Sequence, residues 1–363
     1  MSRFRWGIFG TGAVSAKFVA GLAAARGAEA AFVASRSRGR AEAFAAAVGI
    51  QQAIEGYAEA AATGGVDAVY VATPPSMHVQ HAAYCLEAGL PVLVEKPFAV
   101  TAAEATRLAE LARSKAVFAM EAMWTRFLPA AQALRERIAA GDIGAVRFVA
   151  GNFGTSQTPD RTNGLFDPAL GGGAISHLGA YPISLGQWLF GAPVEMQTIG
   201  HIGASGVDED AAFQLLYPQG AIGSFFTTLR AWAPDDFQVL GERGMVEFRG
   251  SIVRPHGLNV FREGPRGVEA PQLGWRGRLR QHGLVHQVAQ RVGRSSRASG
   301  AGVNHYYAGN GYQYEADEVR ACIQKGLVES RTMPLSDSIA SVRTADSIRR
   351  EIHAQALRGS ETG

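Results

Sequence analysis

The sequence predicts an α/β protein of two domains, the first built on a parallel sheet and the second on an antiparallel sheet. The chain has 363 residues, which is more than a single hydrophobic core usually organises. Short apolar runs alternate with alanine-rich stretches over about the first third of the chain, and strand-like runs then follow one another directly. The alternation is typical of a parallel sheet covered by helices, whereas successive strands with short turns indicate an antiparallel sheet.

The N-terminal elements follow from this alternation in order. We expect strands over residues 6–9, 30–34, 68–72, 91–94 and 117–120. Between them we expect helices over residues 13–25, 38–48, 79–88 and 101–113, the last with Thr101 as its N-cap. The strands are apolar on both sides, which fits a sheet that is buried on both faces.

The C-terminal half is expected to begin with a helix near residues 130–139 and to end with one at 337–356. Strands are expected over residues 146–152, 196–201, 211–217, 221–228, 236–241 and 245–249. Residues 262–302 contain eight Arg against two acidic residues, together with many Gly and Ser. This basic loop is either a solvated surface excursion or a basic contact surface.

The composition is that of an ordinary globular protein, with 47% hydrophobic and 18% charged residues. A net charge of +3 is too small to indicate nucleic-acid binding, and no apolar run approaches the ~20 residues of a membrane span. Cys85 and Cys322 form no metal-type pair, and the N-terminus lacks the apolar core of a signal peptide. We therefore expect a cytoplasmic protein with no metal site, no nucleic-acid partner and no membrane partner.

The segment GIFGTGAVS places Gly10 and Gly12 between the first strand and the first helix. The first glycine allows a tight turn, and the second lets a pyrophosphate approach the backbone. Ala13 and Val14 then open a helix whose N-terminal amides favour a phosphate, and Ser15 takes the place of the usual third glycine. In this strand–turn–helix setting the pattern predicts a Rossmann domain that binds a dinucleotide. The alternative is a glycine-rich turn without a ligand.

The end of the second strand indicates which dinucleotide binds. NAD sites place a carboxylate there for the ribose hydroxyls, but the only acidic residue nearby is Glu42, inside the next helix. Ser35, Arg36, Arg38 and Arg40 cluster at this turn instead. A hydroxyl and a guanidinium suit a 2′-phosphate, so the pattern favours NADP(H) over NAD(H). The alternative is that these arginines are only exposed charges at the start of a helix.

Polar residues follow the third and the fourth clear strand. In an open parallel sheet, ligands bind beyond the carboxyl ends of the strands. The residues expected around the cofactor crevice are Thr73, Pro74, His78, Glu95 and Lys96. Pro97 removes a backbone donor and indicates a cis bond that aims Lys96 into the site, with Glu95 holding the lysine in place.

Four stretches of the sequence are similar to one known family: GTGAVS, ATPPSMHVQHAAYCLEAGLPVLVEKP, EAMWTRFLPA and GGGAISHLGAY. Over nearly its whole length the chain resembles the glucose–fructose oxidoreductase / inositol dehydrogenase (Gfo/Idh/MocA) family, and EAMWTRF and LFDPALGGGA look most similar to the branch of dihydrodiol and NADP-dependent xylose dehydrogenases. The resemblance implies a Rossmann NADP-binding domain over residues 1–122. It further implies a substrate-binding domain over residues 123–363, whose large, mostly antiparallel sheet would join a homodimer or homotetramer.

The resemblance also implies catalytic roles for three residues. Lys96 matches the lysine that touches the reacting oxygen, and Tyr181 matches the general acid/base, whose pKa a neighbouring ammonium is expected to lower. His177 stands one helical turn before Tyr181, where the family usually has Asp. It either lines the substrate pocket, neutral beside Lys96, or is a packed core residue, and we do not expect it to bind a metal.

Trp124 and Arg126 of EAMWTRF fall at the junction of the two domains. We expect them to wall the nicotinamide end of the crevice and to contact phosphate or substrate. The alternative is a packed tryptophan beside a surface arginine.

Together these features predict an NADP(H)-dependent oxidoreductase that acts on a sugar-like or cyclic hydroxy or carbonyl compound. Tyr181 would move the proton and Lys96 would support it. Two alternatives stay open. One is a hydrolase or lyase of the same fold that uses a bound nicotinamide cofactor transiently, and the other is a non-catalytic NADP-binding sensor or partner subunit.

Overall fold

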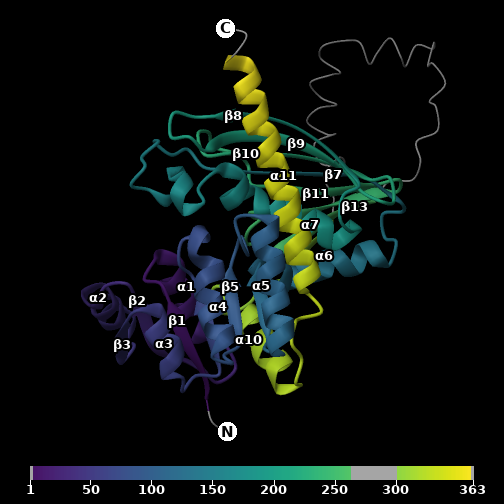
Figure 1. Cartoon of the computed structure of the whole chain (residues 1–363). Coiled ribbons are helices and arrows are strands. Elements are labelled where there is room, and N and C mark those ends of the chain that lie inside the picture. Colours follow the sequence, from purple (N-terminus) through teal and green to yellow (C-terminus); the bar gives the residue numbers. More distant parts are fainter. Residues whose placement is uncertain (1–2, 263–300, 361–363) are drawn as a thin grey trace, which may run out of the picture.

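The N-terminal domain is built on a six-stranded parallel sheet with the strand order β3-β2-β1-β4-β5-β6. In the computed structural model, which describes residues 3–262 and 301–360, this sheet lies in the half of the molecule that carries the N-terminus (Figure 1). Its strands are β1 (Phe4–Phe9), β2 (Ala28–Ser35), β3 (Gln52–Glu55), β4 (Ala68–Val71), β5 (Val92–Glu95) and β6 (Ala119–Ala122). The strand order reverses between β1 and β4, which places a binding crevice at their carboxyl ends.

Helices and their apolar side chains cover both faces of this sheet, and two separate hydrophobic clusters lie against it. The helices are α1 (Ala13–Leu22), α2 (Arg38–Val48), α3 (Tyr57–Thr63), α4 (His78–Glu87) and α5 (Ala102–Lys115). All four residues of β4 and of β5 are buried, as the apolar runs predict. The predicted cap of α5 is confirmed, because the Thr101 hydroxyl accepts from the Glu104 N–H and the Glu104 carboxylate accepts from the Thr101 N–H.

The C-terminal domain is built on an eight-stranded sheet with the order β14-β13-β12-β11-β7-β10-β9-β8. Its strands are β7 (Val146–Gly154), β8 (Glu195–Ile202), β9 (Asp208–Leu216), β10 (Ile222–Thr228), β11 (Phe237–Gly241), β12 (Gly244–Arg249), β13 (Gly257–Arg262) and β14 (Ala301–Asn304). Among these described strands β7 and β10 pair in parallel and the other pairs are antiparallel, so the predicted mostly antiparallel sheet is confirmed. Helices α6 (Pro129–Ala139) and α7 (Ala180–Phe190) precede and follow β7 along the chain.

The last two helices connect the domains. Helix α10 (Tyr312–Gln324) returns to the N-terminal domain and packs against α1. Helix α11 (Leu335–Ser360) contacts α5 and β6 of the first domain, and then α7 and β8 of the second. Figure 1 shows α11 running along both halves of the molecule. Helices α10 and α11, which belong to residues 123–363 in the predicted division, therefore also pack against the domain formed by residues 1–122.

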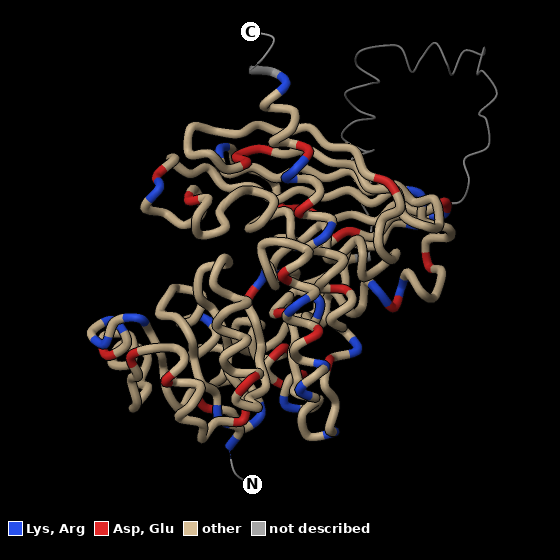
Figure 2. Tube along the Cα trace, in the orientation of Figure 1, with Lys and Arg blue, Asp and Glu red and all other residues tan. Residues whose placement is uncertain are grey.

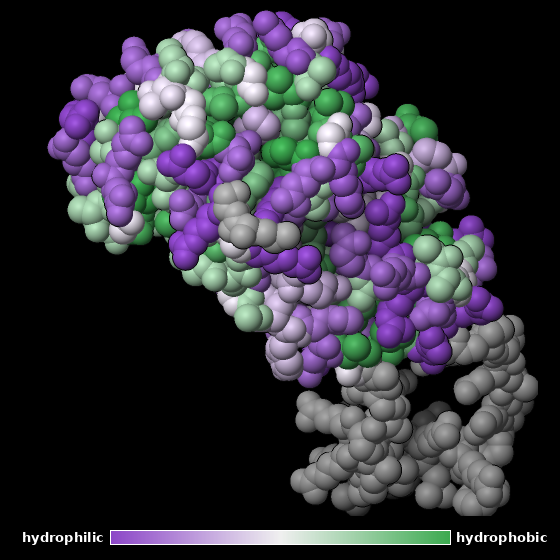
Figure 3. All heavy atoms as spheres, turned by 90° about the horizontal axis from the view of Figure 1, so that it is seen from below, coloured by the Kyte–Doolittle hydropathy of each residue, from purple (hydrophilic) through white to green (hydrophobic). Residues whose placement is uncertain are grey.

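Charged residues of both signs are spread over both domains (Figure 2), and hydrophobic and hydrophilic residues are mixed over the face shown in Figure 3. Most of the predicted basic loop at 262–302 lies outside the described residues. Within the described ranges, no helix is long and apolar enough to cross a membrane.

Candidate active site

A cleft of about 400 Å³, open to solvent, lies at the carboxyl ends of β1, β2 and β4. Seven of the residues predicted to bind a dinucleotide line it: Gly10, Gly12, Ser35, Arg36, Arg40, Thr73 and Pro74. The structure adds Thr11, Ser37, Tyr57, Ala72, Met77 and His81 to this wall. The predicted glycine turn and the predicted basic turn after β2 therefore meet at one surface.

The two glycines of the turn, Gly10 and Gly12, are needed for different reasons. Gly10 has φ +107°, and a Cβ there would lie 2.4 Å from the carbonyl oxygen of Ala72, so the turn requires glycine. Gly12 has φ −83°, and a Cβ there would meet no atom within 4 Å. Free space above Gly12 and the N-terminal amides of α1, which begins with Ala13 and the exposed Val14, fit a bound pyrophosphate.

The basic residues after β2 separate into two groups. The Arg38 guanidinium is exposed and bonded to Glu42 one turn further along α2, at 2.7 Å, and it does not line the cleft. Arg36 and Arg40 do line it. Arg36 therefore has the better placement for a phosphate on the ribose, beside the Ser35 hydroxyl.

Tyr57 and His81 form a wall of the cleft that the sequence analysis missed. Their rings lie 4.1 Å apart, and His81 Nδ1 lies 3.0 Å from the Thr73 hydroxyl. Burial, together with the charges of His78 and Arg36, lowers the pKa of His81 to about 4. Tyr57 was missed because no strand was expected where β3 ends, and His81 was missed because it lies inside the helix predicted at 79–88.

The segment after β5 is fixed by its neighbours. The Lys96–Pro97 peptide bond is cis, as predicted. Glu95 accepts a hydrogen bond from the Lys96 N–H at 3.0 Å, and its other oxygen accepts from the Tyr70 hydroxyl. Glu95 thus holds the backbone of Lys96 and forms no ion pair with its ammonium. The hydroxyl of Tyr70, in an otherwise apolar strand, was the sign of this partner that sequence reasoning missed.

His78 lies behind the crevice and does not line it. Its side chain is buried, with Nδ1 2.8 Å from the Pro97 carbonyl oxygen and Nε2 2.7 Å from that of Thr73. Burial lowers its pKa to about 4, so the ring is neutral and donates to one of the two carbonyls at a time. His78 therefore braces the two strand-end turns, which differs from the predicted place at the cofactor surface.

The Lys96 ammonium points across the domain boundary. It donates to the backbone carbonyl of His177 at 2.9 Å and lies 5.1 Å from the ring centroid of Tyr181. Residues Ile175–Gly179 form a π-helical turn, which disturbs the usual i−4 ladder and makes a carbonyl available. The structure therefore brings together all three predicted catalytic residues.

Tyr181 is buried at the start of α7. Its hydroxyl accepts a hydrogen bond from Trp124 Nε1 at 3.4 Å, and Phe153 packs edge-on against its ring at 5.5 Å. Burial raises the pKa of Tyr181, and the charge of Glu95 raises it further. The expectation that the ammonium of Lys96 lowers this pKa is wrong for the structure, because desolvation and the anion dominate.

His177 is neutral in the structure. Burial lowers its pKa to about 3, and the charges of Lys96 and His78 act in the same direction. This agrees with the neutral histidine expected beside Lys96, while its role in a substrate pocket stays a prediction. Its Nε2 is buried and has no hydrogen-bond partner in the described part of the chain. No group of three potential metal-binding side chains occurs among the described residues.

Trp124 and Arg126, from the short helix Trp124–Phe127, have separate roles. Trp124 stacks on Tyr312 at 4.7 Å and donates a hydrogen bond to the Tyr181 hydroxyl, but it is not among the residues that line the cleft, so its predicted place beside the nicotinamide stays a prediction. Arg126 is fully buried and bonds to Asp337 of α11 at 2.7 Å and to the Ser184 hydroxyl at 2.9 Å. The prediction that Arg126 contacts cofactor or substrate is wrong, because its guanidinium is used inside the protein.

Both domains of the chain match models of one family of oxidoreductases. Residues 4–123 match the "Oxidoreductase family, NAD-binding Rossmann fold" and residues 131–247 match the "GFO/IDH/MocA C-terminal domain". The chain is 33% identical to the mouse (Mus musculus) trans-1,2-dihydrobenzene-1,2-diol dehydrogenase over 96% of each chain. It is 31% identical to the D-xylose 1-dehydrogenase (NADP(+)) of Hypocrea jecorina, over 96% of this chain and 91% of the relative.

The fold is also similar to that of a solved structure. The aldose-aldose oxidoreductase from Caulobacter crescentus superposes with a TM-score of 0.78 at 20% identity, over 97% of this chain and 98% of the other. Sequence and fold thus agree over both domains. The chain belongs to the Gfo/Idh/MocA family of oxidoreductases and is one of its dehydrogenases.

Proposed function

We propose that the protein is an NADP(H)-dependent dehydrogenase of a sugar-like or cyclic hydroxy or carbonyl compound. The observation that carries this proposal is the placement of Lys96 and Tyr181, with the ammonium 5.1 Å from the phenol ring, at the strand-end edge that also holds the dinucleotide cleft. A proton donor and a cation beside the nicotinamide end are what carbonyl reduction and alcohol oxidation require.

The cofactor proposal rests on the ribose end of the cleft. Ser35, Arg36 and Arg40 line it, and none of the residues lining the cleft is acidic. A 2′-phosphate would gain charge-assisted bonds there, whereas the ribose hydroxyls of NAD would find no carboxylate. The relative from Hypocrea jecorina is named as NADP-dependent, which supports the same choice.

The residues of the chain handle the proton and the charge. When bound, the nicotinamide supplies or accepts the hydride. Tyr181 keeps its proton because burial raises its pKa, so it can donate that proton to the oxygen of a carbonyl substrate. The Lys96 ammonium stabilises negative charge on the same oxygen after leaving the carbonyl of His177. Alcohol oxidation needs the phenolate, so its rate should increase with pH.

The substrate proposal rests on the walls of the site. Trp124 and Phe153 contact Tyr181, and Tyr312 stacks on Trp124, so aromatic side chains that pack well against a substrate ring lie near the phenol. The neutral His177 adds a free ring nitrogen that can bond a hydroxyl. Relatives are named for a dihydrobenzene diol and for D-xylose, and both are cyclic compounds with neighbouring hydroxyl groups.

A substrate panel tests the proposed function. Aldoses, cyclic trans-diols and polyols, and the corresponding carbonyl compounds, are supplied with NADP or NAD in the matching redox state. The change in absorbance of the reduced nicotinamide is then followed. Net turnover with NADP on at least one cyclic hydroxy compound is expected. Conversion without net change in nicotinamide redox state would favour the transient use of a bound cofactor, and binding without conversion would favour a sensor.

We also propose that the C-terminal sheet joins two copies of the chain. Helix α11 contacts β8 and β9, where Phe213 is buried, and the opposite face carries Phe148, Ile199 and Phe226, which are 47%, 70% and 43% exposed. Ala212 of β9 pairs with Ile199 of β8 on one side and with Phe226 of β10 on the other, so Ile199, Ala212 and Phe226 form one row across these strands. An apolar row on an open sheet face is typical of a subunit interface, and an identical face would complement it.

We further propose a cytoplasmic location, from the state of the two cysteines. Cys85 and Cys322 are both free and buried, and burial raises the pKa of each thiol. Thiols of this kind persist in a reducing compartment without forming a framework of disulfides.

A further inference from the structure

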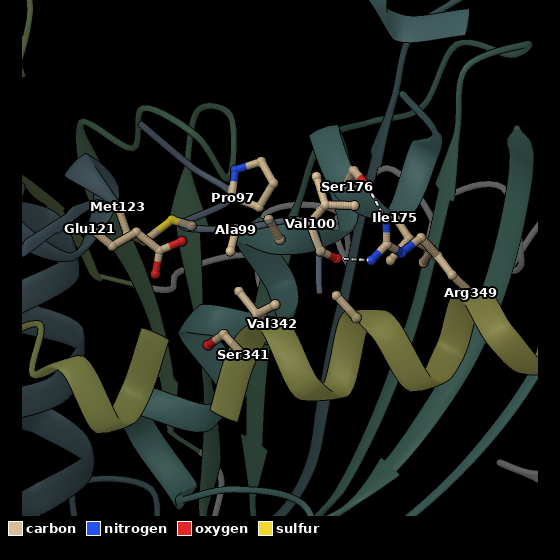
Figure 4. Close-up of a pocket in the computed structure, with 12 residues that line it drawn as sticks. Pro97, Ala99, Val100, Glu121, Met123, Ile175, Ser176, Ser341, Val342 and Arg349 are labelled. Atoms are coloured by element: carbon tan, nitrogen blue, oxygen red, sulfur yellow. Dashed lines mark hydrogen bonds between the residues drawn. The ribbon is translucent and has the colours of Figure 1, made fainter. Parts of the chain in front are cut away.

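A second, narrow cavity, of about 20 Å³, lies behind the segment that carries Lys96 (Figure 4). It shares no lining residue with the dinucleotide cleft. Its walls come from the turn after β5, the end of β6, the π-helical turn and α11. Figure 4 shows Pro97 above the cavity, Glu121 and Met123 on one side, and Ser341 and Val342 of α11 below.

Glu121 is an unusual residue for the middle of a buried strand. Its side chain is 2% exposed, and Oε1 accepts a hydrogen bond from the Phe98 N–H at 2.9 Å. Its Oε2 has no hydrogen-bond partner in the described residues, and no Lys or Arg among them lies within ion-pair distance. A buried carboxylate without an ion pair costs several kcal/mol, so packing alone does not account for it.

The bond to Phe98 completes a set of contacts on the lysine segment. Glu95 accepts from the Lys96 N–H, His78 bonds the Pro97 carbonyl, and Glu121 accepts from the Phe98 N–H. Pro97 has no N–H of its own. Three hydrogen bonds therefore fix the backbone of Lys96–Phe98: one to the Lys96 N–H, one to the Pro97 carbonyl and one to the Phe98 N–H. Glu121, from β6, accepts the third of them.

Glu121 also acts on the charge of Lys96. Burial lowers the pKa of the lysine, whereas the negative charges of Glu95 and Glu121 raise it. The anion behind the segment thus favours the ammonium form that the proposed chemistry uses.

We propose that Glu121 is a positioning residue for Lys96, which holds the turn after β5 through Phe98 and sustains the ammonium by its negative charge. This inference rests on the role of Lys96 in the proposed function. The groups that face Glu121 are the Phe98 N–H and Glu95 from β5, Arg126 from the Trp124–Phe127 helix and Ser338 from α11. Ser341 and Arg349 of α11 line the same cavity.

The protonation of Glu121 gives the proposal a pH signature. Burial raises the pKa of Glu121 to about 7, against the opposing effects of Ser338, the Phe98 N–H and Arg126. Since the folded pKa is raised, the carboxylate is present above this pH and is lost as the pH falls. Support for the ammonium of Lys96 should therefore weaken on the acidic side of neutrality.

The test uses the fact that the chain has only four lysines, namely Lys17, Lys96, Lys115 and Lys325. Competitive labelling with acetic anhydride, read by mass spectrometry of the peptides, gives the apparent pKa of each lysine in the intact protein. In Glu121→Gln, which keeps an oxygen for the Phe98 N–H, we expect the pKa of Lys96 to fall by about one unit, the effect of a lost nearby anion. The exposed Lys115 and Lys325 should not change.

Measurements of kcat separate the effect of the negative charge of Glu121 from the effect of its hydrogen bond to Phe98. Glu121→Gln should lower kcat by roughly threefold to tenfold, and Glu121→Leu, which also loses the acceptor, by about 10²-fold, with the KM for cofactor nearly unchanged. Ser341→Ala is the matched control, because it removes a hydroxyl from the same cavity without touching the lysine segment. It should keep both kcat and the pKa of Lys96.

The outcomes are distinct. An unchanged labelling pKa of Lys96 in both Glu121 variants, with kcat within twofold of wild type, would overturn the proposal and leave Glu121 as a packing residue only. Labelling needs no substrate, so this result would be recognised even if no compound of the panel were converted. Absence of turnover in the wild type would instead count against the proposed function.

Discussion

The ammonium of Lys96 donates a hydrogen bond to the backbone carbonyl of His177, 2.9 Å away, and so joins the first domain to the second at the crevice. Tyr181, one turn after His177, lies with its ring 5.1 Å from the same ammonium. A substrate oxygen that takes over the ammonium from the carbonyl would arrive beside the phenol. Lys96 and Tyr181 therefore mark the place where we expect the substrate oxygen to react.

Arg36→Ala should weaken NADPH binding by roughly tenfold to a hundredfold, the effect of one lost charge-assisted contact. Binding of NADH should be nearly unchanged, because NADH carries no 2′-phosphate. Arg38→Ala is the matched control, since Arg38 is bonded to Glu42 outside the cleft. Fluorescence titration of the reduced cofactors measures both effects. An equal loss for NADPH and NADH in Arg36→Ala would remove the 2′-phosphate assignment.

Lys96→Met and Tyr181→Phe should each reduce turnover by roughly 10²-fold or more, the scale of general acid–base catalysis. Cofactor affinity should fall much less in Tyr181→Phe. In the wild type, the raised pKa of Tyr181 keeps the phenol protonated, so alcohol oxidation should become faster with rising pH. Steady-state rates between pH 6 and about 10, a range set by the ordinary tyrosine pKa, measure this dependence. Near-normal turnover in Tyr181→Phe would move the proton role to another group.

The two glycines of the turn should respond in opposite ways to substitution. Gly10→Ala should lower the free energy of unfolding, because φ is +107° and the new Cβ would lie 2.4 Å from the Ala72 carbonyl oxygen. Gly12→Ser should leave stability unchanged or slightly higher, since serine is a good N-cap and its Cβ meets open space. The serine should weaken cofactor binding, because it occupies the space proposed for the pyrophosphate. Thermal unfolding and cofactor titration of both variants give the comparison; full affinity in Gly12→Ser would relocate the pyrophosphate.

His177 should make the fold sensitive to acid. Its folded pKa of about 3 lies below that of the unfolded chain, so the unfolded state binds an additional proton as the pH falls below about 6.5. Its contribution to stability is therefore present above this pH and is lost progressively as the pH falls from about 6.5 to about 3. From pH 7 to pH 5, wild type should lose about 1–2 kcal/mol relative to His177→Asn, as urea unfolding would measure. A difference between the two proteins that stays constant with pH would show that His177 is not held neutral.

Ile199→Asp should separate the proposed subunits, because it places a charge in the apolar row of the open sheet face. Sedimentation velocity should show a dimer or tetramer for wild type and a smaller species for the variant. Glu195→Gln, on the same strand, is a control that removes an exposed charge and should leave assembly intact. A wild-type protein that sediments as a monomer would contradict the proposed interface.

Much of the N-terminal domain follows from the sequence, because parallel strands and their polar ends are local patterns. Gly10, Arg36, Thr73 and Lys96 could be placed at one edge by the rule that ligands bind beyond strand ends. The partner of Arg126 could not, since Asp337 lies 211 residues further along the chain and no local pattern links them. The direction of the Tyr181 pKa shift depends on burial, which a residue type alone does not reveal.

Tyr312 and Glu121 were missed for related reasons. Tyr312 stacks on Trp124 from α10, a helix that the sequence analysis did not predict. Glu121 lies in a short strand whose burial makes its charge unusual, and an isolated acidic residue in a sequence carries no such mark. Both become visible only when the tertiary contacts are known.

Helix α11 limits how the crevice can admit a ligand. It packs on α5 and β6 at one end and on α7 and β8 at the other, and Arg349 ties it to the Val100 carbonyl of the first domain and to Ser176 of the second. A hinge rotation that spread the two halves apart would have to detach this single continuous rod from one of them. Entry and release should therefore proceed by local movements of the turns at the strand ends, while the halves keep their mutual orientation throughout the reaction cycle.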